Sequence, residues 1–195
     1  MSGVEVGIAS WYGHPYHGRV AASGEIYDME LLTAAHRTLP FGTWVRVVDL
    51  DNEKTVEVRI NDRGPFIDDR VIDLSHAAAN AIDMIGPGLA RVRLEVMAMP
   101  AAVAMTPGSF AVQVGAFHLR DNAERLRAEM EAQYGAARLV LRPGDPALWR
   151  VLVGRAPTVD DAGALAQRIR AEQTGKLGQA FVVREDVTNT TQGTM

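Results

Sequence analysis

Three short stretches of the sequence carry side chains that can exchange protons with a substrate. Asp62 lies in "RINDRGPF", directly after a run in which every second residue is apolar. His36 lies in "LTAAHRTLPFGT", and Glu25 follows a Ser-Gly pair in "ASGEIYD". Carboxyl and imidazole groups are common general acids and bases in enzymes. These stretches therefore nominate Asp62, His36 and Glu25 as candidates for acid–base chemistry.

Each candidate also has a purely structural interpretation. Asn, Asp, Gly and Pro all favour turns, so the segment that contains Asp62 predicts a turn as readily as a site. A single histidine is commonly a hydrogen-bonded structural residue, and a glutamate after glycine commonly lies in a solvated turn. Asp73, two residues before Ser75, is interpreted as structural, either pairing with Arg63 or capping a helix. Taken one at a time, the candidates leave both interpretations open.

Short strands must position these residues in the first half of the chain. Val56, Val58 and Ile60 alternate with polar residues, which is the period of a half-buried strand. A hairpin-like spacing separates this strand from the one before it, with "DNEK" between them. One helix is predicted over residues 76–85, with Ser75 as its N-cap and a Gly-Pro pair as its end. The other predicted strands lie in residues 7–13, 44–50 and 91–96. This pattern predicts a small β-barrel.

The second half contains an internal repeat. Residues 110–130 and 149–169 align without gaps, and each unit has a strand, a glycine turn and an amphipathic helix. A further strand follows each helix, so the predicted order is βαββαβ, the ferredoxin-like plan. Asp121 is predicted to cap the first helix together with Glu124. The residues of that helix predicted to face the sheet are Leu119, Ala123, Leu126 and Met130.

One face of this second sheet is predicted to lack a helix. Val112 and Val114 point toward the helices, so the strand alternation turns Gln113 to the other side. By the same alternation, Arg150 and Leu152 point away from the helices. A face with an amide, a cation and apolar neighbours suits a polar, uncharged polymer. Gln113 and Arg150 are therefore candidate ligand contacts, with an ordinary solvated face as the open alternative.

Composition excludes several classes of function. The chain has 195 residues, a net charge of -4 and no cysteine, which excludes disulfides and cysteine chemistry. Neither half is basic enough to suggest a nucleic-acid partner, and no apolar run is as long as a membrane span. The ten N-terminal residues do not resemble a secretory leader. The histidines lack metal-ligand spacing, so neither a metal nor another cofactor is predicted.

The expected domain organisation is two modules with a short joint. Residues 5–97 form the first module and residues 108–186 the second. Residues 98–107 are uncharged, with two prolines and several small residues, and are predicted to be a linker. Residues 187–195 are predicted to be a flexible tail. The sequence does not specify an oligomeric state.

Six segments of the first module together resemble the rare lipoprotein A family. They are "GIASWYG", "ASGE", "LTAAHRTLPFGTWVRV", "VRINDRGPF", "RVIDLSHAAA" and "IGPGLARVRLEV", in the family's order. The resemblance implies a six-stranded double-psi β-barrel. "FAVQVGAF" and "WRVLVG" in the second module resemble the SPOR domain, which binds peptidoglycan. The resulting fold class is mainly β plus α+β.

The resemblance implies lytic transglycosylation of peptidoglycan. The expected substrate is a glycan strand without stem peptides (denuded), cut at the MurNAc-GlcNAc β-1,4 bond to leave a 1,6-anhydroMurNAc end. The family's motifs place the catalytic aspartate, histidine and glutamate at Asp62, His36 and Glu25. The resemblance also implies SPOR-directed targeting to the division septum, in the periplasm or cell envelope.

The implied chemistry assigns a role to each of these residues. Asp62 is expected to protonate the leaving oxygen and then to accept the proton of the sugar's own 6-hydroxyl. A raised pKa of Asp62 is required for the first step, and Glu25 is expected to supply a like charge if it lies close. His36 is expected to orient Asp62, share its proton or stabilise developing charge. Tyr12 and Phe66 are expected to stack on sugar rings, whereas Trp11 is expected to pack in the core.

Two other functions fit the same barrel. One is a non-catalytic, expansin-like peptidoglycan-binding protein, and the other is a hydrolase that uses two carboxylates. The chain also departs from the family in three ways: it has no lipobox cysteine, its linker is short, and Glu53 stands where the family often has glycine. The short linker suggests that the two modules lie close together.

Overall fold

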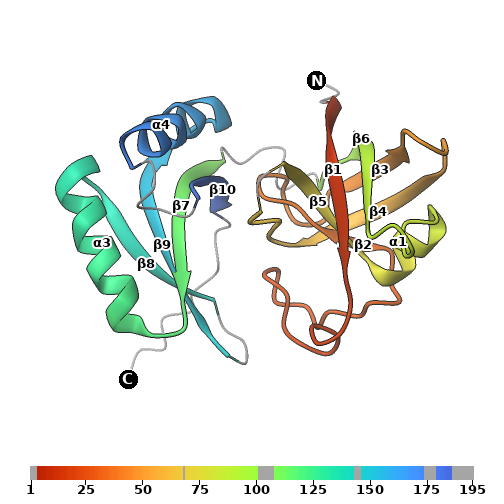
Figure 1. The fold of residues 1–195 in the computed structure, drawn as a ribbon, viewed down its shortest axis with the longest axis horizontal. Helices are drawn as coiled ribbons and strands as arrows, with labels where there is room; N and C mark the ends of the chain where they lie inside the picture. The colour runs from red at the N-terminus through yellow and green to blue at the C-terminus, as the bar shows by residue number, and fades with distance from the viewer. Residues whose placement is uncertain (1–3, 68, 101–107, 143–145, 174–178, 186–195) are drawn as a thin grey trace.

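The structure, a computed structural model, describes residues 4–67, 69–100, 108–142, 146–173 and 179–185. Two domains lie side by side, a barrel in the N-terminal half and a helix-covered sheet in the C-terminal half (Figure 1). Among the described helices, none combines the length and hydropathy needed to cross a membrane. Most of the predicted linker and the predicted tail fall outside the described residues, so their boundaries stay predictions.

The first domain is a closed barrel of six strands in the order β1-β5-β2-β4-β3-β6. The strands are β1 (Val4–Tyr12), β2 (Thr33–Ala35), β3 (Trp44–Asp49), β4 (Thr55–Asp62), β5 (Arg70–Ser75) and β6 (Leu89–Ala98). The β1–β5 and β2–β4 pairs are parallel, and the other pairs are antiparallel. The predicted six-stranded barrel is confirmed. Its closure leaves no free sheet edge and aligns the end of β4 with the end of β2.

The barrel core follows the alternation in the sequence. Val56, Val58 and Ile60 point inward from β4 and are buried, as predicted. Trp11 packs against the same core, also as expected. Burial of such side chains contributes about 25 cal/mol per Å² of apolar surface and stabilises the barrel that presents Asp62.

The barrel's helix α1 (His76–Ala81) begins where it was predicted but ends earlier. The Ser75 hydroxyl accepts a hydrogen bond from the Ala78 amide at 3.2 Å, so Ser75 is the N-cap. The prediction of a helix through residue 85 was wrong. Asp83 has a φ of 59°, a left-handed conformation that an α-helix does not contain.

The hairpin between β3 and β4 contains one of the departures from the family pattern, Glu53. Glu53 has a φ of 61°, a left-handed conformation that disfavours residues with a Cβ. Glycine adopts this conformation without steric strain. The departure at Glu53 therefore concerns local turn strain and lies at the hairpin tip, away from the candidate catalytic residues.

The second domain is a four-stranded antiparallel sheet in the order β10-β7-β9-β8. Its elements are β7 (Ser109–Phe117), α3 (Arg120–Tyr134), β8 (Ala137–Arg142), β9 (Leu148–Ala156), α4 (Val159–Glu172) and β10 (Phe181–Glu185). The predicted βαββαβ order is confirmed. Both helices lie on the side of the sheet away from the barrel (Figure 1).

Two details of the repeat were predicted wrongly. Helix α3 begins after Leu119, which is its N-cap, so Asp121 lies in the first turn and is not the cap. Leu119 is also 67% exposed and does not face the sheet, whereas Ala123 and Met130 are fully buried as expected. At the equivalent position of the second unit, Thr158 accepts from the Asp161 amide at 3.1 Å. The cap therefore lies two residues before the aspartate in both units.

The two domains contact each other directly. The Arg184 amide donates to the Arg37 carbonyl at 3.0 Å. Phe66 of the barrel meets Phe181 of β10 edge to face, with 5.9 Å between ring centroids. The expectation that a short linker keeps the modules close therefore matches the described contacts.

Alanine substitutions at Met130 and Leu119 test which of these residues contributes to the core of the second domain. Met130 is fully buried against the sheet, so Met130→Ala is expected to lower the free energy of unfolding by about 2–5 kcal/mol. Leu119→Ala removes a similar volume from an exposed position and should change it by less than about 0.5 kcal/mol. Urea denaturation followed by circular dichroism measures both. A large loss for Leu119→Ala would contradict the exposed position of this side chain.

Candidate functional site

Asp62 is the last residue of β4, and its carboxylate is largely buried. Oδ1 accepts hydrogen bonds from the amides of Ala22 and Arg63, each at 2.8 Å. The Asp62 carbonyl accepts from the His36 amide at 3.1 Å, which continues the pairing of β2 with β4. The strand therefore ends at this residue, and backbone donors hold its carboxylate, while its role toward a substrate stays a prediction.

A guanidinium from the second domain completes the surroundings of Asp62. Arg142, the last residue of β8, places Nη2 at 3.1 Å from Oδ1 and 3.2 Å from Oδ2. Charge-assisted bonds of this kind are stronger than neutral ones. In this arrangement Arg142 contacts both carboxylate oxygens of Asp62. No sequence pattern near either residue indicates the pair.

Gly64 allows the chain to turn sharply after Asp62. Its φ of 154° lies in a region that residues with a side chain rarely adopt. A Cβ at this position would also lie 3.5 Å from Oδ2 of Asp73 and 3.7 Å from Cβ of Ala35. Both distances are ordinary van der Waals contacts, so the backbone conformation, and not a lack of space, favours glycine at this turn.

His36 lies close to Asp62 through its backbone, while its ring contacts other groups. Nδ1 accepts from the amides of Thr38 at 3.2 Å and Leu39 at 3.0 Å. An acceptor Nδ1 places the proton on Nε2, which lies 3.1 Å from Oε2 of Glu5. Burial lowers the pKa of His36, against the opposing effect of the Glu5 carboxylate. The ring is therefore a neutral, hydrogen-bonded group that supports the segment beside Asp62.

Glu25 forms an ion pair with Arg59 of β4. Its two carboxylate oxygens accept from Arg59 at 2.8 and 2.7 Å, and Asn61 Nδ2 lies 3.5 Å away. The hydrogen bonds from Arg59 hold the pKa of Glu25 below its ordinary value. Asn61 precedes Asp62 on β4, and successive strand residues point to opposite sides. The carboxylate of Glu25 thus interacts with the side of β4 that carries Arg59 and Asn61.

Two tyrosines pack near Asp62. The rings of Tyr12 and Tyr27 are stacked with centroids 4.3 Å apart, and the Tyr27 hydroxyl donates to the Tyr12 carbonyl at 2.6 Å. Burial raises the pKa of both hydroxyls, and the charge of Asp62 raises them further. Among the described residues, the buried Tyr12 hydroxyl has no hydrogen-bond partner. Tyr12 therefore lies near Asp62, but one side of its ring already contacts Tyr27.

Asp73 is a second, partly buried carboxylate near Asp62 that sequence reasoning treated as structural. It accepts a hydrogen bond from the Ser10 hydroxyl, while Ser75, not Asp73, caps the helix. Burial raises the pKa of Asp73, and the charge of Asp62 also raises it. The only sequence signal was a polar residue within the otherwise apolar run of β5. The proximity of Asp73 to Asp62 arises from the closure of the barrel and is not visible in a sequence motif.

Arg63 does not project toward solvent. Its Nη1 donates to the carbonyls of His36 at 3.0 Å and Leu39 at 2.8 Å, and its guanidinium lies 3.8 Å from the centroid of the Phe41 ring. Asp68, one of the acids expected near Arg63, lies outside the described residues. These bonds show that Arg63 secures the segment after β2.

The predicted ligand face of the second domain is covered by the barrel. Gln113 is only 5% exposed, and its Oε1 accepts from Arg150 Nε at 2.6 Å. Leu152 is buried in a small apolar cluster on this face, against which Phe66 of the barrel packs. The Arg150 guanidinium lies 5.8 Å from the centroid of the Phe66 ring. The expectation of an open face was therefore wrong for this arrangement, because the barrel contributes an aromatic side chain to it.

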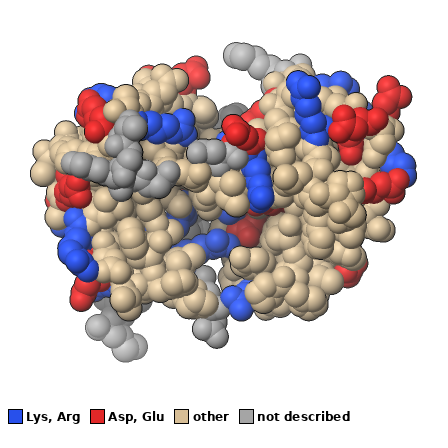
Figure 2. All heavy atoms as spheres, in the orientation of Figure 1, with Lys and Arg blue, Asp and Glu red and all other residues tan. Residues whose placement is uncertain are grey.

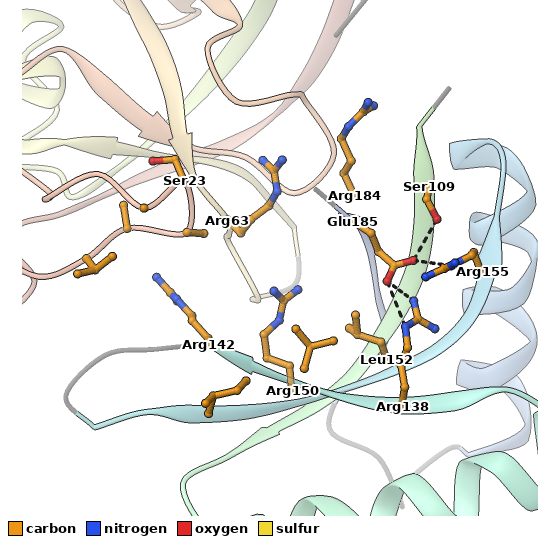
Figure 3. A pocket seen from close by; sticks show the side chains of 16 residues that line it. Ser23, Arg63, Ser109, Arg138, Arg142, Arg150, Leu152, Arg155, Arg184 and Glu185 are labelled. Atoms are coloured by element: carbon orange, nitrogen blue, oxygen red, sulfur yellow. Dashed lines mark hydrogen bonds and ion pairs between the residues drawn. The ribbon is translucent and has the colours of Figure 1, made fainter. Parts of the chain in front are cut away.

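A cavity of about 730 Å³ lies between the two domains. The barrel contributes residues 20–24 and Arg63, and the sheet of the second domain contributes the remaining lining. Basic side chains are visible in the hollow where the domains meet (Figure 2). Figure 3 shows arginines reaching into it from both domains. Ala22 and Arg63, whose amides bind Asp62, line this cavity, so the carboxylate lies at its edge.

The described residues contain no cluster of three or more His, Cys, Asp or Glu side chains with the geometry of a metal site. The histidines of the barrel instead make hydrogen bonds and ring contacts. His76, for example, has Nδ1 at 3.0 Å from Glu30 and packs against Trp11. The chemistry available at Asp62 is that of carboxylates, guanidinium groups and tyrosines.

Comparison with known proteins gives a consistent picture. A family model described as lytic transglycolase matches residues 4–94, and the SPOR domain model matches residues 106–184. The endolytic peptidoglycan transglycosylase RlpA of Campylobacter jejuni is 36% identical over 202 residues, which cover 92% of this chain and 71% of that protein. The RlpA of Helicobacter pylori (strain 26695) is 39% identical over 154 residues, covering 65% of this chain and 49% of that protein.

Other similarities are confined to part of the chain. The RlpA of Vibrio cholerae is 55% identical over 93 residues, which cover 48% of this chain and 35% of that protein. Among solved structures, the peptidoglycan-binding domain of the Bacillus subtilis cell wall lytic enzyme CwlC is 26% identical with a TM-score of 0.33. It covers 46% of this chain and all of that domain. The chain thus spans about half, or less, of the Helicobacter and Vibrio relatives.

The state of His36 can be measured by ¹⁵N NMR. We expect a neutral ring with the proton on Nε2 and a pKa below the ordinary value of 6.5. Because the unfolded chain then binds this proton first, stability should decline as pH falls from about 6.5 toward the folded pKa. Glu5→Gln should lower the pKa further by removing a charge that raises it. Glu53→Gln, at an exposed hairpin tip, is the control. A proton on Nδ1 or a pKa above 6.5 would contradict the assigned geometry.

Proposed function

The chain belongs to the RlpA family, and on that premise we propose that it is an endolytic peptidoglycan lytic transglycosylase. Its substrate is the peptide-free glycan strand, cut at the MurNAc-GlcNAc β-1,4 bond to leave a 1,6-anhydroMurNAc end. One observation carries the proposal. The candidate acid, Asp62, is a buried carboxylate fixed by the Ala22 and Arg63 amides at the edge of the interdomain cavity.

Asp62 acts twice in the proposed reaction. In its protonated form it donates the proton to the glycosidic oxygen, and the bond between C1 of MurNAc and that oxygen breaks. The resulting carboxylate then accepts the proton of the 6-hydroxyl as O6 bonds to C1. The nucleophile is part of the same sugar, so its effective concentration is on the order of 10⁵ M or more. Arg142 has to leave Asp62 before the leaving oxygen can approach, because it contacts both carboxylate oxygens.

His36 and Glu25 have supporting roles in this proposal. The His36 amide binds the Asp62 carbonyl, and the ring fixes the segment that follows β2 through its bonds to Thr38 and Leu39. Glu25 holds Arg59, and the loop that carries it also supplies the Ala22 amide to Asp62. Both residues therefore position Asp62 through the backbone around it.

The remaining predicted contacts belong to glycan binding. Tyr12 and Phe66 offer aromatic surface to sugar rings, and Gln113 and Arg150 offer hydrogen bonds from the second sheet. We place the second domain's role in binding denuded strands, which would direct the enzyme to the division septum. The cell envelope, and within it the periplasm, is the location consistent with that substrate.

Hydrolysis is the second candidate function, and it is favoured by the presence of a second carboxyl group, Asp73, near Asp62. Asp73 is a partly buried carboxyl whose pKa is raised by desolvation, and the charge of Asp62 contributes to that rise. Hydrolases of the inverting type use two carboxyl groups and a water molecule. An expansin-like binder remains the third candidate, since a binding protein can retain the same residues.

Digestion of peptide-free glycan strands, followed by mass spectrometry of the products, tests the proposal. The wild type should give fragments with 1,6-anhydroMurNAc ends. Asp62→Asn keeps the shape but removes the proton-transfer group, so activity should fall by about 10²-fold or more. Glu57→Gln is the control, because Glu57 lies on the same strand but is exposed and pairs with Arg46.

The products distinguish the three candidates. Reducing ends that carry the mass of an added water would replace the lyase by a hydrolase. Strands that bind to the protein but stay uncut would leave a peptidoglycan-binding protein. Full activity of Asp62→Asn would remove Asp62 from its proposed role.

A further inference from the structure

Arginines dominate the lining of the interdomain cavity. Among the described residues that line it, six are arginines and Glu185 is the one acidic side chain. The six are Arg63 from the barrel and Arg138, Arg142, Arg150, Arg155 and Arg184 from the second domain. Glu185 already interacts with two of them, as the dashed lines in Figure 3 show. A concave, low-dielectric site with a single sign of charge attracts ligands of the opposite charge.

Two of the other arginines lie next to the catalytic candidate. Arg142 contacts Asp62, and Arg150 lies beside Gln113 and Phe66. Arg184 is on the opposite edge strand of the sheet, with its guanidinium over the Phe110 ring, and is set apart from this pair. Arg142 and Arg150 come from the adjacent strands β8 and β9, so the fold, not a sequence cluster, brings them together.

The shape and chemistry of the cavity indicate the class of ligand. Its volume of about 730 Å³ is within the usual range of small-molecule sites, roughly 300–1,000 Å³. Guanidinium groups match the planar geometry of carboxylates and bind them with two parallel hydrogen bonds. Leu152 and Val140 add apolar surface to the lining, which suits the face of a sugar ring. A saccharide that carries a carboxylate meets all of these conditions.

We propose that this cavity binds the lactyl carboxylate of a peptide-free MurNAc residue, with Arg142 and Arg150 as its contacts. This inference rests on the proposed function, since it names the group by which that substrate is selected. In peptide-free strands the lactyl group ends in a free carboxylate. A stem peptide converts the carboxylate into an amide, which removes the negative charge and adds bulk. The cavity therefore discriminates between the two kinds of strand by charge.

The position of Arg142 links this selection to catalysis. Without a strand, Arg142 has the Asp62 carboxylate as its partner. A lactyl carboxylate in the cavity offers the same guanidinium a second partner of the same chemistry. Transfer of Arg142 to the substrate uncovers Asp62, which then faces the glycosidic oxygen. A strand without the free carboxylate lacks the group that draws Arg142 away.

Binding of the disaccharide GlcNAc-MurNAc to the full chain tests the proposal by isothermal titration calorimetry. This ligand contains no MurNAc-GlcNAc bond, so the wild type can be used without cleavage. The comparison ligand is the same disaccharide with its lactyl carboxylate converted into an N-methylamide. We expect the acid to bind at least about tenfold more tightly than the amide, corresponding to about 1.4 kcal/mol. The difference should shrink as the salt concentration rises.

Single variants identify the groups responsible. Arg142→Gln and Arg150→Gln should each weaken binding of the acid several-fold and leave binding of the amide nearly unchanged. Arg125→Gln is the control, because Arg125 is an exposed arginine on α3, on the other side of the sheet. Circular dichroism verifies that each variant is folded.

Three results would overturn the proposal. They are equal affinity for acid and amide, an unchanged preference in both arginine variants, and equal weakening of both ligands by those variants. The outcome is independent of the cleavage assay, because the disaccharide reports binding alone. If strands are not cleaved but the acid still binds more tightly than the amide, the proposed enzymatic activity is wrong and the carboxylate site stands. If strands are cleaved but acid and amide bind equally, the carboxylate site is wrong and the enzymatic activity stands.

Discussion

The Asp62 carboxylate is the point at which the two domains are joined electrostatically. It accepts bonds from the Ala22 and Arg63 amides within the barrel and from Arg142 of the second domain. A charge removed from water without such partners is strongly destabilising, so a buried carboxylate requires several donors. This requirement connects a barrel loop, the end of β4 and the end of β8 at one place. The candidate catalytic group and the interdomain contact are therefore the same group.

The position of Arg142 has consequences for the rest of the interface. Arg142 ends β8 and pairs across the hairpin with Leu148 of β9, two residues before Arg150. The helix-free face of the sheet is consequently turned toward the barrel, and Phe66 packs on it. The predicted glycan-binding face and the predicted catalytic carboxylate thus open onto one cavity. A ligand that enters this cavity encounters both domains at once.

The three candidate acid–base residues have very different physical surroundings. Asp62 is held by backbone amides and one displaceable cation. His36 is buried and neutral, with both ring nitrogens in hydrogen bonds to groups other than Asp62. Glu25 is partly exposed and bound to Arg59 at two points. Residue type alone makes them equivalent candidates for proton transfer. Their environments differ, and the proposed reaction therefore gives Asp62 the central role and His36 and Glu25 positioning roles.

The sequence by itself determined the barrel strands, the βαββαβ plan and the N-cap at Ser75. These features depend on local periodicity and on side chains that satisfy nearby backbone groups, and both are visible in a short window of sequence. The same local logic failed at Leu119 and at the end of α1. There, a difference of a few residues depends on backbone conformation, such as the left-handed Asp83.

Only the tertiary structure decided which groups surround Asp62. Arg142 is 80 residues away in the chain, and Asp73 approaches through the closure of the barrel. A count of charges gives the second half of the chain nearly as many acids as bases, yet five of its ten arginines line one cavity. Charge placement depends on which strands are neighbours and which face each side chain takes after packing. No local pattern contains that information, because it arises only when the two domains meet.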